Sequence, residues 1–255
     1  MILVQISDTH LGFPGAVDPE RALERAVRQI LAIEPSPAAV LVSGDLTHNG
    51  SPEEYQRLRQ LLSPLTMPVH PLMGNHDKRQ ALREAFADHA PLHNGRETVD
   101  YSVDCAGLRL ICLDSCKPDS DAGQLLPEQL TWLRAQLEAG AGAATMVALH
   151  HPPFPCGMDQ FDLICLPPAD RQAFAQTLEG VRGLEGVMCG HIHRPIVGRV
   201  GTVPAMVCPS VFLQSQLNLK PQGALRLIPG GVGLAVHIYT PGQPLLTHIQ
   251  ALDGD

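Results

Sequence analysis

Aspartate, asparagine and histidine side chains are grouped at four places along the chain, and each group directly follows a short apolar run. The first two groups are Asp8-Thr9-His10 and Gly44-Asp45. The third is Gly74-Asn75-His76-Asp77, and in the last His150 precedes Gly190-His191-Ile192-His193. Because apolar runs of this length are typical of buried strands, we expect the side chains that follow them to converge at one edge of a sheet. The expected metal ligands are Asp8, His10, Asp45, Asn75, His150, His191 and His193.

The ligand types indicate the chemistry. Carboxylate and amide oxygens combined with imidazole nitrogens suit borderline divalent metals better than they suit a thiolate-loving ion. Asp8 and His10 are two residues apart, so they can chelate one ion from the same side of a strand end. Asp45 has two oxygens with which to bridge two ions. A pair of ions lowers the pKa of bound water and stabilises in-line displacement at phosphorus, so we predict two metal ions and a phosphate-ester hydrolase.

Two further residues are predicted to be catalytic. His76 lies beside the ligand Asn75 without being an evident ligand, so it is placed to stabilise the phosphoryl oxygen or to protonate the leaving alkoxide. Asp77 could orient His76 through a hydrogen bond, or cap a helix predicted over residues 78–86. His151 adjoins His150 and competes with it for the ligand position.

The apolar pattern predicts an α/β protein with a largely parallel core. Strands are expected over residues 2–6, 39–42, 69–73, 108–114, 145–149 and 186–189. Helical patterns between several of them, over 19–31, 51–62 and 127–137, indicate βαβ units. From about residue 194 short β runs over 196–200, 203–207, 224–228 and 233–238 predict antiparallel additions. Residues 101–104 and 108–113 predict a hairpin.

Composition bounds the function. A chain of 255 residues without an internal repeat or linker is expected to form a single domain. The formal charge of −8 and the lack of a basic run disfavour a genomic nucleic-acid partner. Seven cysteines without a C-x-x-C pair fit a reducing compartment, and no apolar stretch reaches the roughly 20 residues of a membrane span. We therefore expect a cytoplasmic protein.

The five motifs together resemble the calcineurin-like metallophosphoesterase superfamily. They are Asp8-x-His10, Gly44-Asp45, Gly74-Asn75-His76-Asp77, His150-x-Pro152 and Gly190-His191-x-His193. The resemblance implies a four-layer αββα sandwich, in which two mixed sheets are flanked by helices. It also implies a binuclear centre of iron, manganese, zinc or cobalt and attack of a metal-bridging hydroxide on phosphorus. It places Asp8, His10 and His193 on the first ion, Asn75, His150 and His191 on the second, and Asp45 between them.

Within that superfamily the chain resembles bacterial class III cyclic-nucleotide phosphodiesterases and glycerophosphodiesterases. His48 stands where purple acid phosphatases have a tyrosine, and residues 157–162 are similar to glycerophosphodiesterase-type members. The resemblance implies hydrolysis of cAMP or of small glycerol-linked and alkyl diesters. The alternatives are a broad phosphomonoesterase or protein phosphatase and a scaffold without metals, although no ligand is lost here. By analogy with similar proteins, a homodimer or a higher homo-oligomer is expected.

Overall fold

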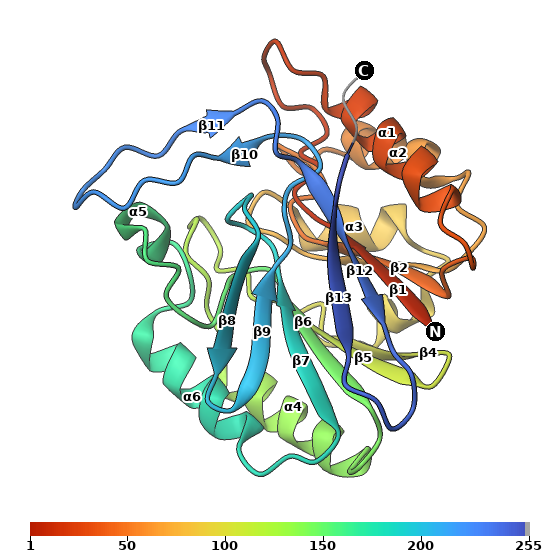
Figure 1. The fold of residues 1–255 in the computed structure, drawn as a ribbon, viewed down its shortest axis with the longest axis vertical. Helices are drawn as coiled ribbons and strands as arrows, with labels where there is room; N and C mark the ends of the chain where they lie inside the picture. The colour runs from red at the N-terminus through yellow and green to blue at the C-terminus, as the bar shows by residue number, and fades with distance from the viewer. Residues whose placement is uncertain (253–255) are drawn as a thin grey trace.

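Two β-sheets face each other in the computed structural model, which describes residues 1–252 (Figure 1). The first sheet has the order β13-β12-β1-β2-β3 and the second the order β4-β5-β6-β7-β9-β8. The strands of the first sheet are β13 (Leu246–Ala251), β12 (Gly233–Ile238), β1 (Ile2–Ile6), β2 (Ala39–Ser43) and β3 (Val69–Leu72). Those of the second are β4 (Tyr101–Cys105), β5 (Leu108–Leu113), β6 (Thr145–Leu149), β7 (Leu184–Cys189), β9 (Val203–Val207) and β8 (Ile196–Val200).

Helices cover the outer face of each sheet, so the predicted αββα sandwich is confirmed. Residues of α1 (Pro19–Leu31), α2 (Pro52–Leu62) and α3 (Arg79–Ala85) pack in one apolar cluster with the first sheet. Residues of α4 (Pro127–Ala139) and α6 (Pro168–Leu178) pack in a second cluster with the second sheet. Three short elements complete the described chain: the 3-10 helix η1 (Ala90–His93), the helix α5 (Asp159–Asp162), and a hairpin of β10 (Gln214–Ser215) with β11 (Leu227–Ile228).

Local sequence explains where the first two long helices begin. Asp18 accepts a hydrogen bond from the backbone N–H of Glu20 and caps α1, and Pro19 occupies the first position. Ser51 and Glu54 form the predicted capping box of α2, in which each side chain accepts from the other residue's backbone N–H. These caps fix the ends of the helices that lie on the first sheet.

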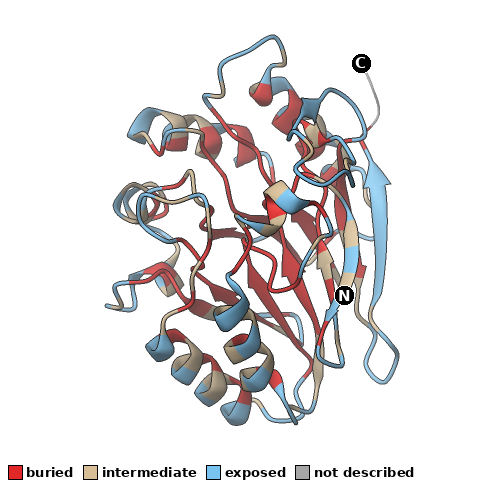
Figure 2. Cartoon of the chain, turned by 90° about the vertical axis from the view of Figure 1, so that its left-hand side faces the viewer, coloured by how far each residue is buried: buried red, intermediate tan, exposed pale blue. Residues whose placement is uncertain are grey.

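The parallel strands divide between the two sheets, which the apolar pattern alone did not predict. β1, β2 and β3 are parallel in the first sheet, while β5, β6 and β7 are parallel in the second. The C-terminal strands join both sheets, because β12 pairs antiparallel with β1 whereas β9 pairs with β7. Within residues 224–228 only Leu227–Ile228 is a strand. Strand β13 lacks a buried face along its whole length and therefore gave no alternating signal (Figure 2).

None of the helices in residues 1–252 is long and apolar enough to cross a membrane. All seven cysteines are free thiols. The division into one domain, the cytoplasmic location and the oligomeric state stay predictions.

Candidate metal centre

The carboxyl ends of five parallel strands meet between the two sheets, and every predicted ligand follows one of them. Asp8 and His10 follow β1, Asp45 follows β2 and Asn75 follows β3. From the second sheet, His150 follows β6, and His191 and His193 follow β7. Backbone hydrogen bonds hold the loops together, such as those from Asp8 N to Gly44 O at 3.1 Å and from Gly190 N to His150 O at 3.0 Å. The predicted convergence is therefore present.

Five of the seven ligand residues have a left-handed backbone, which is uncommon for residues other than glycine. Their φ angles are +56° for Asp8, +44° for His10, +48° for Asp45, +73° for His191 and +53° for His193. Conformations of this kind cost about 1–3 kcal/mol each and persist only where the surrounding structure enforces them. The chain turns sharply as it leaves each strand, and this directs the side chains into the gap between the sheets.

The glycines of the motifs allow these loops to pack closely. A Cβ atom on Gly44, whose φ is +97°, would lie 2.2 Å from Nδ1 of His150. A Cβ atom on Gly74 would lie 2.1 Å from the backbone nitrogen of Asp45. Because real Cβ atoms do not approach other atoms this closely, any larger residue would displace a ligand.

Asp8, His10, Asp45 and His193 form one buried cluster whose potential ligand atoms all lie within 4.8 Å of one another. The Nε2 atoms of His10 and His193 are 3.0 Å apart. Nε2 of His10 lies 3.4 Å from Oδ2 of Asp45, and Nε2 of His193 lies 3.5 Å from Oδ1 of Asp8. This set of two carboxylates and two imidazoles could hold one divalent ion.

Asp45, His150 and His191 form a second buried cluster within the same limit. Nε2 of His150 lies 3.4 Å from Oδ2 of Asp45. Asn75 lines a cavity together with Asp45 and His191, and its amide nitrogen lies 3.5 Å from Oδ1 of Asp121. Asp45 is the residue shared by the two clusters, in the position that suits a bridging carboxylate.

Several buried polar atoms in these clusters have no hydrogen-bond partner. They are Oδ2 of Asp8, Oδ1 of Asn75, and Nε2 of His150 and of His191. An unpaired buried polar atom costs roughly 1–3 kcal/mol, so a site that keeps several of them needs a ligand to satisfy them. These residues therefore fit bound metal ions.

Hydrogen bonds from the far side of two rings fix which nitrogen faces the site. Nδ1 of His150 lies 2.8 Å from the carbonyl oxygen of Ser43, and Nδ1 of His193 lies 2.9 Å from that of Leu213. Because a carbonyl oxygen only accepts, Nδ1 carries a proton in both rings, which leaves Nε2 as the nitrogen that can bind a metal. Metal-binding histidines are oriented in the same way in other proteins.

Burial and charge act differently on the ligands. Burial lowers the pKa of His10 and of His191 well below the ordinary value, which keeps both imidazoles neutral. Burial raises the pKa of Asp8. Although burial acts in the same sense on Asp45, the neighbouring His150 and His10 hold its pKa well below the ordinary value. Although burial opposes it, the carboxylates of Asp45 and Asp8 raise the pKa of His150 to about 9, so without a metal its imidazole carries a proton that a bound cation would replace.

Comparison with known proteins identifies the family. The calcineurin-like phosphoesterase profile matches residues 1–195. The chain belongs to the calcineurin-like phosphoesterase family. This confirms the resemblance drawn from the five motifs. A relative named as a probable cyclic nucleotide phosphodiesterase of Rhodococcus erythropolis is 33% identical over 250 residues, which cover 93% of this chain and 79% of the relative.

Two further comparisons agree with this membership. A probable glycerophosphodiester phosphodiesterase GpdQ of Arcobacter nitrofigilis is 28% identical over 253 residues, which cover 97% of this chain and 92% of the relative. Among solved structures, the purple acid phosphatase PPD1 from yellow lupin seeds superposes with a TM-score of 0.66 over 98% of this chain and 51% of its own. At 15% identity, that likeness shows a shared calcineurin-like fold.

His76 and Asp77 lie at the centre but face different partners. Nδ1 of His76 lies 2.8 Å from the carbonyl oxygen of His48, and the backbone N–H of His76 donates to Asp45. The Asp77 carboxylate accepts from the backbone of Gly74, from Tyr55 and from the segment after β2. In the described chain Asp77 makes no hydrogen bond to the His76 ring and does not cap α3, whose N-cap is Lys78. It holds the two ligand loops together instead.

The structure brings His48 to the centre, although the sequence assigned it no role. The His48 ring stacks on His76 with centroids 4.9 Å apart and meets Phe13 edge-on at 5.0 Å. His151, the alternative to His150 as a ligand, belongs to neither ligand cluster. Its Nδ1 lies 2.8 Å from Oγ of Ser115. His48 lies three residues after the ligand Asp45, which was the one sequence feature that could have indicated a role. This spacing alone does not show that the His48 ring faces the cavity.

A cavity of about 230 Å³ opens over the ligands. We call the polar ligand site at its base, with His76, the floor. Five of the seven ligands line the cavity, whereas Asp8 and His150 are fully buried and do not. One side, which we call the wall, is apolar and consists of Phe161 and Ile164 near α5 together with Leu225 and Leu227 near β11. The hairpin of β10 and β11 reaches towards α5, and the backbone N–H of Gln222 donates to Asp159 at 2.9 Å (Figure 1).

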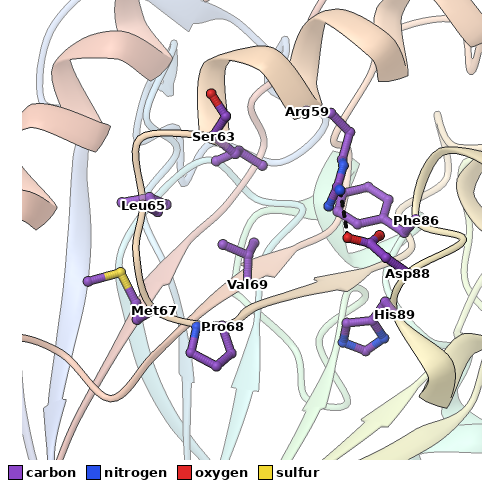
Figure 3. A pocket seen from close by; sticks show the side chains of 10 residues that line it. Arg59, Ser63, Leu65, Met67, Pro68, Val69, Phe86, Asp88 and His89 are labelled. Atoms are coloured by element: carbon purple, nitrogen blue, oxygen red, sulfur yellow. Dashed lines mark hydrogen bonds and ion pairs between the residues drawn. The ribbon is translucent and has the colours of Figure 1, made fainter.

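A larger cavity of about 430 Å³ lies at the other end of β3, beside α2 and the segment after α3 (Figure 3). Its charged groups, Arg59 and Asp88, are paired with each other at 2.7 Å. None of the predicted ligands lines it, and the strand-end cavity is therefore the candidate active site.

Proposed function

We propose that this chain is a metal-dependent phosphodiesterase that hydrolyses 3′,5′-cyclic nucleotides such as cAMP, or small glycerophosphodiesters and alkyl phosphodiesters. The observation that carries the proposal is the position of Asp45 in both ligand clusters, surrounded by ligand atoms that lack other partners. The family membership and the names of the relatives from Rhodococcus and Arcobacter support a diester substrate.

Asp8, His10 and His193 would hold one ion, and Asn75, His150 and His191 would hold the other, with Asp45 able to contribute to both. When bound, such ions supply an activated water and neutralise the charge of the phosphoryl oxygens. Iron, manganese, zinc and cobalt all accept mixed nitrogen and oxygen ligands.

His76 is the residue we assign to proton transfer. Its Nδ1 proton is held by the carbonyl oxygen of His48, so Nε2 is the atom that can hold or give a proton. The ring lines the cavity next to the ligands. A proton delivered from Nε2 to the leaving alkoxide would complete the cleavage of the phosphorus–oxygen bond, whereas Asp77 acts as a positioning residue through the loops that it joins.

The test uses bis(p-nitrophenyl) phosphate as a diester and p-nitrophenyl phosphate as a monoester. We expect diester turnover that disappears with a chelator and returns with Mn²⁺, and a much lower monoester rate on the same preparation. A panel of cAMP and glycerophosphodiesters would then identify the preferred class. Metal-loaded protein without diester turnover would contradict the proposal, and a faster monoester rate would favour the phosphomonoesterase alternative.

The predicted homo-oligomer and the cytoplasmic location also remain part of the proposal. The location is supported by seven free cysteines, as expected where thiols stay reduced.

A further inference from the structure

A second group of metal-binding side chains lies outside the catalytic centre. Cys156, Asp162 and Cys165 have ligand atoms that all lie within 4.8 Å of one another. Cys156 and Asp162 are half-buried, and Cys165 is buried. All three belong to one segment, in which the two cysteines lie on either side of α5. The proposed reaction uses none of them.

The Asp162 carboxylate is fixed in place by the chain around it. Oδ1 accepts from the backbone N–H of Cys156, and Oδ2 accepts from that of Gly157 at 3.2 Å. The thiol of Cys156 also donates to Oδ1, with the sulfur 3.1 Å away. The thiol proton therefore lies between a sulfur and a carboxylate oxygen, which is where a cation bound to both atoms would replace it.

We propose that Cys156, Asp162 and Cys165 form a site for one thiophilic divalent cation such as Zn²⁺, separate from the catalytic pair. Zn²⁺ binds both cysteine thiolates and carboxylate oxygens, and three protein ligands leave one tetrahedral position for water. The Asp162 carboxylate adds a third ligand atom to the two sulfurs, which a cation would use and a disulfide would not. The participation of Asp162 is what favours a metal over thiol oxidation.

The position of this site connects it to the catalytic cavity. The segment between the two cysteines carries Phe161 and Ile164, which form half of the wall. A cation held by Cys156 and Cys165 would fix both ends of that segment. The site would thus set the shape of the wall without touching the reacting atoms.

Cobalt distinguishes the two sites, because only one of them contains sulfur. We would add Co²⁺ to the chelator-treated full-length chain and record the thiolate-to-cobalt charge-transfer absorption in the near ultraviolet. The nitrogen and oxygen ligands of the catalytic centre give no such band. We expect the band in the wild-type protein and its loss in Cys156→Ser and in Cys165→Ser. Asp162→Asn should weaken Co²⁺ binding at this site by at least about tenfold.

Cys105→Ser is the matched control, because Cys105 is a buried thiol at the end of β4 in the other apolar cluster. It should keep the band. Cys156 is half-buried, so we expect Cys156→Ser to fold even if Cys165→Ser does not. A wild-type circular dichroism spectrum would verify the fold of each variant independently of turnover. A wild-type protein without the band, a band that survives Cys156→Ser, or a Cys156–Cys165 disulfide in freshly reduced protein would overturn the proposal. Each of these results leaves diester turnover, and hence the proposed function, to be judged separately.

Discussion

The floor and the wall of the catalytic cavity are built in opposite ways. The floor is polar and follows five buried parallel strands, so its side chains are fixed by the two sheets. The wall is apolar and comes from a four-residue helix and a two-stranded hairpin, with Leu225 and Leu227 exposed to 45% and 36%. The two sheets therefore determine the reaction, whereas short surface segments determine which diester fits.

The largest expected effect comes from the residue shared by both ligand clusters. Asp45→Asn should lower metal content and reduce kcat/KM for bis(p-nitrophenyl) phosphate by at least about 10³-fold, because several kcal/mol of transition-state stabilisation depends on the ions. Elemental analysis and steady-state kinetics would measure both effects. Asp119→Asn, at an exposed aspartate, is the control. A variant that keeps its metals and its turnover would show that Asp45 does not hold the ions.

His76→Ala separates chemistry from metal binding within the floor. We expect both metals to remain and kcat to fall by about 10²- to 10⁴-fold, most severely for diesters with poor leaving groups, which need a proton most. His248→Ala replaces an exposed histidine and should leave kcat unchanged. Loss of metal in His76→Ala would instead make His76 a ligand.

The free energy of unfolding should depend on pH through His237, a buried residue of β12. Its Nε2 hydrogen-bonds to Oε1 of Gln5, whose amide nitrogen donates to Cys189 O of the other sheet at 3.0 Å. Burial lowers the pKa of His237 to about 4, so below pH 6.5 the unfolded chain binds a proton that the folded chain does not. This contribution is therefore complete above pH 6.5 and is lost as the pH falls towards 4.

Denaturant unfolding with chelator present would measure this effect without interference from metal loss. Between pH 7 and pH 5, the wild-type protein should lose about 2 kcal/mol more stability than His237→Gln does. An equal loss of stability in the two proteins would show that His237 is not the group that titrates in this range.

The smallest effect is expected in the wall. Leu227→Ala should raise KM about tenfold for diesters that fill the cavity, because a lost apolar contact is worth roughly 1–3 kcal/mol, while kcat stays near the wild-type value. Leu246→Ala removes a leucine that is 55% exposed on β13, away from the cavity, and serves as the control. A fall in kcat without a change in KM would place Leu227 among the residues that act on the chemistry.

The same contrast explains how much the sequence could predict. Apolar runs followed by ligands identify the floor, because strand and ligand lie next to each other in the chain: β1 ends at Ile6 and Asp8 follows. Which strands share a sheet depends on pairing between distant segments, so the four-layer αββα arrangement could be predicted only from the family resemblance. The contacts of His48 and Asp77 could not be predicted from the sequence. His48 stacks on the ring of His76, and Asp77 accepts from five hydrogen-bond donors in three separate segments. The exposed β13 had no pattern to detect.

Electron paramagnetic resonance of the Mn²⁺-loaded protein would show whether Asp45 joins two ions in one centre. If Asp45 bridges two ions, wild-type protein with diester turnover should show the exchange-coupled signal of a manganese pair. Asp45→Asn should lose that coupling. Active wild-type protein that shows only the signal of isolated Mn²⁺ would contradict a shared carboxylate and the paired centre built on it.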